Sequence, residues 1–83
     1  MKTTYPDGLL QIKMAGVPFL GEYKGIEKAH CIVCGRDSMC HTFRMITDIE
    51  NYPNYTTYTT FHFGETHAQR YVKVIGAATI SKV

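Results

Sequence analysis

With 83 residues the chain is long enough for one small domain, and a core of that size is marginal without a metal or a disulfide. Its formal net charge of +2 is too weak to indicate a polyanionic partner. Three cysteines, an odd number, cannot all pair with one another within the chain. We find no signal-peptide pattern at the N-terminus and no apolar run long enough to span a membrane. We therefore expect a protein of the reducing cytoplasm with no membrane partner, in which thiols serve a metal or chemistry rather than disulfides.

The N-terminal extension, residues 1–29, is expected to contain a β-hairpin. Leu10, Ile12 and Met14 alternate with polar residues, which is the pattern of a half-buried strand. A turn at residues 15–16 would let the chain return as a second, short strand.

A second hairpin is expected further along the chain. Residues 41–49 and 55–63 are rich in Thr, Tyr, Phe and Ile, and they flank strong turn-forming chemistry at residues 51–54. A register with Phe43 opposite Phe61 gathers the apolar side chains on one face, whereas a slip of one residue would split them. That face holds Phe43, Met45, Phe61 and Phe63.

The pattern after this hairpin predicts an amphipathic helix. Ala68, Tyr71, Val72 and Ile75 recur at i, i+3, i+4 and i+7, which places them on one helical face. The helix is expected to run from about residue 64 to residue 76, and residues 77–83 form a tail.

Two short motifs carry metal-binding chemistry. The sequence Cys31-Ile-Val-Cys34-Gly35 is typical of a tight knuckle whose backbone amides point at the sulfurs, so one metal ion can bind both thiolates. His67 falls in the first turn of the predicted helix. Thiolate and imidazole ligands together favour zinc, which in structural sites is almost always four-coordinate.

These motifs, taken in order, resemble those of small bacterial treble-clef zinc modules. The resemblance rests on Cys31-x-x-Cys34-Gly35, the strand Cys40-His41-Thr42, and Phe61-His62-Phe63 followed by Glu65-x-His67-Ala68. It covers residues 31 to about 73. It does not cover the N-terminal hairpin. Together with that hairpin it implies a single α+β domain, in which a treble-clef-like zinc module over residues 30–76 ends in a helix. It also implies one Zn²⁺ bound by Cys31, Cys34 and His67.

The fourth ligand is open, because Gly64 stands where the family has a cysteine. Cys40 is our first choice, since the apolar register places it opposite Gly64 and its thiolate completes a Cys₃His set. His62, on the same strand face as Gly64, is second, and His41, on the other face, is third. The alternatives are a site with water in the fourth position, a redox-active thiol pair, and a metal-free protein whose cysteines pack as small apolar residues.

Catalytic motifs are missing from the sequence, so we expect a non-enzymatic protein. The resemblance implies a role in holding other macromolecules. Tyr52, Tyr55 and Tyr58 form a tyrosine-rich turn and strand, which is either a partner-binding surface or an ordinary solvated β-strand.

Two functions are therefore expected. The first is a small zinc-binding protein that binds another protein as an adaptor, an inhibitor or a regulator. The alternative is a nucleic-acid-binding zinc module, in which basic residues contact phosphates and tyrosines stack on bases. The basic residues concerned are Lys24, Lys28, Arg36, Arg70 and Lys73.

Overall fold

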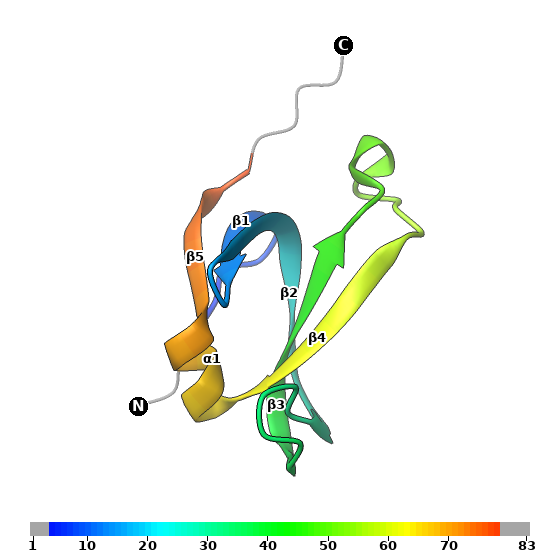
Figure 1. The fold of residues 1–83 in the computed structure, drawn as a ribbon. Helices are drawn as coiled ribbons and strands as arrows, with labels where there is room; N and C mark the ends of the chain where they lie inside the picture. Colours follow the sequence, from blue (N-terminus) through cyan, green and yellow to red (C-terminus); the bar gives the residue numbers. More distant parts are fainter. Residues whose placement is uncertain (1–3, 79–83) are drawn as a thin grey trace.

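The computed structural model describes residues 4–78, which form a five-stranded antiparallel sheet and one short α-helix (Figure 1). The sheet order is β4-β3-β2-β1-β5, so α1 joins the two edge strands. A seven-residue helix spans only about 10 Å, whereas five flat strands span about 19 Å from edge to edge. The sheet therefore curls toward a partly open barrel. Its elements in chain order are β1 (Leu9–Met14), β2 (Val17–His30), β3 (Asp37–Ile46), the 3₁₀ helix η1 (Ile49–Asn51), β4 (Tyr58–Gly64), α1 (Glu65–Tyr71) and β5 (Val72–Ala77).

The predicted N-terminal hairpin is confirmed. Strands β1 and β2 are joined by a two-residue turn in which both Ala15 and Gly16 have positive φ, as in the turns that match strand twist. The return strand is longer than predicted, because β2 pairs with β1 near its start and with β3 over its later part. Pro18 lies before the β3 pairing begins, so its missing N–H interrupts no ladder on that side.

The predicted register of the second hairpin is confirmed. Phe43 pairs with Phe61 across β3 and β4, and Cys40 pairs with Gly64. Phe43 is fully buried and Phe63 nearly so, which is the outcome that the apolar pattern required.

The predicted treble-clef-like fold with a C-terminal helix is wrong. Helix α1 ends at Tyr71, and the next residues form β5, which pairs antiparallel with β1 from Met14↔Val72 to Leu10↔Ala77. The β-branched residues in this segment favour a strand, and β1 offers it an edge whose backbone groups need partners. Of the predicted tail, Ala77 belongs to β5 and residues 79–83 lie outside the described residues.

The core lies inside the curl of the sheet, where α1 packs. Its buried side chains come from β1, β3, β4, α1 and β5, so the helix is fixed against the sheet by Ala68 and by the strand that follows it. This packing determines where His67, one residue earlier, projects. No helix within residues 4–78 is long and apolar enough to cross a membrane. The buried cluster comprises Leu10, Ile12, Met14, Phe43, Phe63, Ala68 and Val72.

Candidate metal centre

The knuckle, residues 31–35, is a tight turn held to β4. The Gly35 N–H donates to the Cys31 carbonyl at 2.7 Å, which closes the turn. Gly35 has φ +74°, a left-handed conformation that glycine adopts without strain. The Ile32 N–H donates to the carbonyl of His62 in β4 at 2.8 Å. The sequence Cys-x-x-Cys-Gly therefore produces the local structure that it predicted.

The sulfur of Cys31 lies in an electropositive environment. Burial by itself raises the pKa of this thiol. The backbone amides of Gly64, Cys34 and Val33 and the side chain of His67 bond the sulfur, and together they lower the pKa to about 6. A pKa below its usual range favours the thiolate form of Cys31, the form that binds metals.

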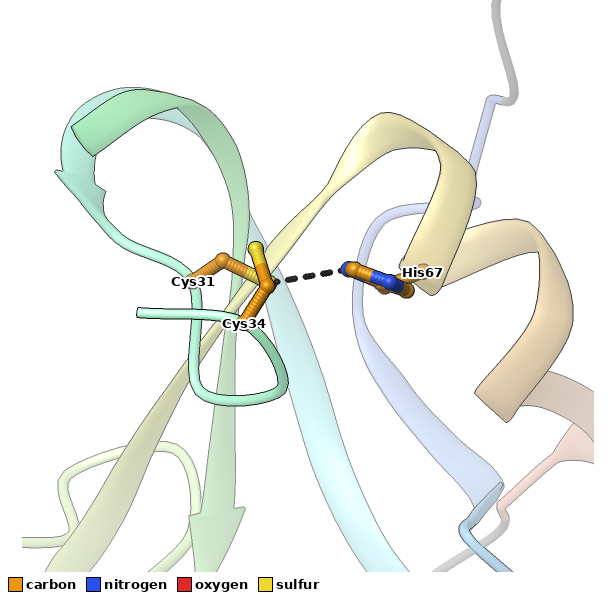
Figure 2. A group of neighbouring side chains, drawn as sticks. All are labelled: Cys31, Cys34 and His67. Atoms are coloured by element: carbon orange, nitrogen blue, oxygen red, sulfur yellow. Dashed lines mark hydrogen bonds between the residues drawn. The ribbon is translucent and has the colours of Figure 1, made fainter. Parts of the chain in front are cut away.

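Cys31, Cys34 and His67 form one potential metal-binding group (Figure 2). Cys31 Sγ lies 3.3 Å from His67 Nδ1, and one ligand atom of each residue lies within 4.8 Å of the others. Ligand atoms on a tetrahedral zinc lie about 3.5 to 3.8 Å apart, because Zn–S is about 2.3 Å and Zn–N about 2.0 Å. A shift of about 1 Å or less therefore closes this group around a zinc ion.

Cys40, the predicted fourth ligand, is not part of this group. Its Sγ donates to the carbonyl of Ala29 at 3.4 Å and lies 3.5 Å from Ser38 Oγ. The side chain is fully buried. The predicted register is correct, yet it aligns the backbones of Cys40 and Gly64 without bringing the Cys40 thiol to the other sulfurs. Its role as a ligand stays a prediction.

The two alternative histidines bond other groups. His62 Nδ1 lies 3.1 Å from Thr42 Oγ1 and 3.6 Å from a carboxylate oxygen of Glu27. His41 is buried, and its ring bonds the Tyr23 hydroxyl at 2.7 Å on one side and the Glu65 carboxylate on the other. Neither imidazole is in the group that contains Cys31.

Chemically, this group can hold one metal ion that favours thiolate and imidazole. Cys34 is exposed, so an ion bound there is accessible from solvent. A metal ion here would tie the loop between β2 and β3 to α1. These two segments are separated in the sequence by strands β3 and β4.

An apolar groove that the sequence did not predict lies beside the candidate metal centre. It has a volume of about 500 Å³. The knuckle contributes Ile32 and Val33, which are 57% and 44% exposed although both are large and apolar. Two such residues between Cys31 and Cys34, in a turn where polar residues are usual, were the signal in the sequence. The walls include Val17, Phe19, Ile32, Val33, Phe61 and Tyr71.

The three predicted partner-binding tyrosines lie away from this groove and contact residues of their own chain. The hydroxyls of Tyr52 and Tyr55 both donate to the carboxylate of Glu22. The guanidinium of Arg44 lies 4.3 Å from the ring centroid of Tyr58. These contacts within the chain explain why tyrosines stand at these positions. The role of the three tyrosines in partner binding stays a prediction.

Comparison with known proteins does not assign the chain to a family: no protein-family model, no curated protein and no solved structure matches it. These comparisons therefore do not test the resemblance of the metal-binding motifs to treble-clef modules.

Proposed function

We propose that this chain is a small, non-enzymatic zinc-binding protein of the reducing cytoplasm that acts by binding another protein. Zinc is the metal that the donor set favours, because two thiolates and an imidazole suit a structural zinc ion. The observation that carries the protein-binding role is the apolar groove, one wall of which is built by the residues between the two cysteine ligands.

The metal centre and the groove share two structural elements. Ile32 and Val33 lie between Cys31 and Cys34, and Tyr71 lies one turn beyond His67 on α1. A zinc ion that ties the cysteines to His67 therefore fixes two walls of the groove relative to each other. Preorganised walls lower the entropic cost of binding, so the metal would support recognition without contacting the partner.

Exposed apolar surface of this kind usually marks an interaction site in a soluble protein. Val17, at the rim of the groove, is 62% exposed. The proposed role is that of an adaptor, inhibitor or regulator, in which the groove receives apolar side chains of a partner.

Affinity capture with the zinc-loaded protein tests this proposal. We expect wild type to retain one or more protein partners that Val17→Asp fails to retain. Ile75→Asp is a matched control, because Ile75 is also apolar and 55% exposed but lies on β5 outside the groove. Capture that is equal for wild type and Val17→Asp, or absent for wild type, would refute the proposal.

Nucleic acid is the second candidate partner, favoured by Lys13, Arg70 and Lys73, which line a common pocket. Binding of this kind would weaken steeply as salt concentration rises, because cation contacts to phosphates release counterions. Binding of a protein in the apolar groove depends on salt much less. A titration with single-stranded DNA at two salt concentrations separates the two functions.

A further inference from the structure

The candidate metal centre draws three ligands from this chain. Within residues 4–78, Cys31, Cys34 and His67 form the group of cysteine, histidine and carboxylate side chains whose ligand atoms lie within 4.8 Å of one another. Residues 1–3 and 79–83 contain no cysteine, histidine, aspartate or glutamate to add a fourth. Structural zinc is almost always four-coordinate, whereas a zinc ion with three protein ligands binds a further molecule. The source of the fourth ligand therefore decides what this centre can bind.

The other thiol and imidazoles of the chain bond groups outside this centre. The Cys40 thiol donates to the carbonyl of Ala29 at 3.4 Å. His30 Nδ1 lies 2.8 Å from a carboxylate oxygen of Asp37. The two remaining histidines, which also bond side chains elsewhere, are His41 and His62. With these groups engaged, the arrangement favours a fourth ligand from outside the chain.

The space for such a ligand lies beside Gly64. A Cβ atom at this position would lie 3.7 Å from Cys31 Sγ and 3.7 Å from Ser38 Oγ. Both are ordinary van der Waals distances, so the glycine leaves room for one heavy atom. Two thiolates on a tetrahedral zinc ion lie about 3.8 Å apart. A heavy atom in this space therefore has the distance from Cys31 Sγ that a further sulfur on the same ion would have.

The hydroxyl of Ser38 borders the same space. Ser38 Oγ lies 3.5 Å from Cys40 Sγ, and the Cys40 thiol donates its own proton to the carbonyl of Ala29. The Ser38 hydroxyl is therefore the donor in this contact. Because a hydroxyl hydrogen rotates to suit its acceptor, it can turn toward an anionic ligand atom beside Gly64.

A thiolate suits this space better than an imidazole does. Its sulfur is a terminal atom with one substituent, whereas an imidazole nitrogen lies between two ring carbons. Cys31 is buried and Gly64 is half-buried, so a slender ligand reaches the space more easily. Thiolates are also soft ligands, which a zinc centre with cysteine ligands accepts. Cys34 is exposed, so a small molecule can approach the centre from solvent.

We propose that the thiolate of a small external thiol is the fourth ligand of the zinc ion, with its sulfur beside Gly64. This inference rests on the zinc centre of the proposed function and adds a ligand-binding position to it. The thiol gives its proton to solvent, and a sulfur electron pair forms the bond to zinc. Nothing is oxidised or reduced, and no bond of the protein breaks.

X-ray absorption spectroscopy at the zinc edge tests the proposal, because it counts the sulfur atoms bound to zinc. The zinc-loaded protein is measured in thiol-free buffer under argon and again after addition of mercaptoethanol. We expect the number of zinc–sulfur bonds to rise from two to three. In cobalt-loaded protein, the thiolate-to-cobalt charge-transfer absorbance should rise roughly 1.5-fold for the same reason. Its dependence on mercaptoethanol concentration gives the affinity for the thiol.

Variants beside the proposed ligand test its position. Gly64→Ala places a methyl carbon where the sulfur would lie, so it should bind zinc but show no response to mercaptoethanol. Gly76→Ala is the matched control, because a Cβ at this position on β5 would meet no atom within 4 Å. Ser38→Ala should bind the thiol roughly threefold to tenfold more weakly, since it removes one hydrogen bond.

The outcomes that overturn the inference are distinguishable. A protein that binds neither zinc nor cobalt would refute the metal centre as well. Two zinc–sulfur bonds both with and without mercaptoethanol would refute the external thiolate and leave the centre standing. Three such bonds without added thiol, falling to two in Cys40→Ser, would make Cys40 the fourth ligand.

Two further outcomes concern the position and the source of the thiolate. A response to mercaptoethanol that persists in Gly64→Ala would exclude the space beside Gly64. A capped tripeptide with one central cysteine carries the same donor atom on a polypeptide. We expect it to respond more weakly than mercaptoethanol, because its backbone extends on both sides of the cysteine. An equal response to the tripeptide would assign the thiolate to another polypeptide instead of a small thiol.

Discussion

Replacing Gly64 by cysteine is expected to tighten zinc binding at the metal centre. A Cβ atom at position 64 would lie 3.7 Å from Cys31 Sγ, with no closer contact to any neighbouring atom. The backbone there has φ −60° and ψ 158°, which any residue adopts. From such a Cβ, a thiol can reach the separation of about 3.8 Å that two thiolates have on tetrahedral zinc.

The size of the expected gain in zinc affinity follows from the binding free energies of structural zinc sites. Apparent binding free energies of four-ligand sites are about 10 to 16 kcal/mol at neutral pH, so one ligand in four is worth about 3 kcal/mol. A difference of that size corresponds to an increase in zinc affinity on the order of 100-fold. The gain requires that Cys31, Cys34 and His67 are the ligands present in wild type.

Competition with a chromophoric chelator measures the zinc affinity of each variant. Gly64→Ala is the control, because it adds the Cβ without a ligand and should bind zinc as wild type does. An affinity of Gly64→Cys equal to that of Gly64→Ala would refute the three-ligand geometry. Cys40→Ser then identifies the reason: a sharp loss of affinity there would mean that Cys40 turns toward the metal and already completes the site.

Three further predictions concern single side chains. Cys34→Ser should abolish the zinc-dependent rise in melting temperature and leave metal-free stability within about 0.5 kcal/mol of wild type, because Cys34 is exposed; an unchanged zinc effect would exclude Cys34 as a ligand. In metal-free protein, the ultraviolet absorbance of thiolate should appear as pH rises through about 6, the lowered pKa of Cys31. This step should be missing in Cys31→Ser. Tyr5→Phe should raise the free energy of unfolding in urea by about 1 kcal/mol, because the buried Tyr5 hydroxyl has no hydrogen-bond partner among residues 4–78; a loss of stability would contradict this.

Features that depend on neighbours in the chain could be predicted from the sequence. The knuckle follows from the spacing of Cys31 and Cys34 before a glycine, and the first hairpin from its alternating pattern. The pairing of Phe43 with Phe61 was also predictable, because only one register places the apolar residues of both strands on a single face. The helical spacing of apolar residues likewise predicted that His67 lies in the first turn of α1.

Other features were decided by tertiary contacts. The segment after Tyr71 contains both a helical spacing and an alternation of inward Val72 and Val74 with outward Lys73, and the free edge of β1 selected the strand. Pairing with β1 shortened α1 and removed the expected treble-clef fold. Backbone register also did not determine side-chain direction, so Cys40 pairs with Gly64 while its thiol bonds Ala29. The apolar groove exists only because the curled sheet brings the knuckle, the first hairpin turn and α1 together, and these segments are far apart in the sequence.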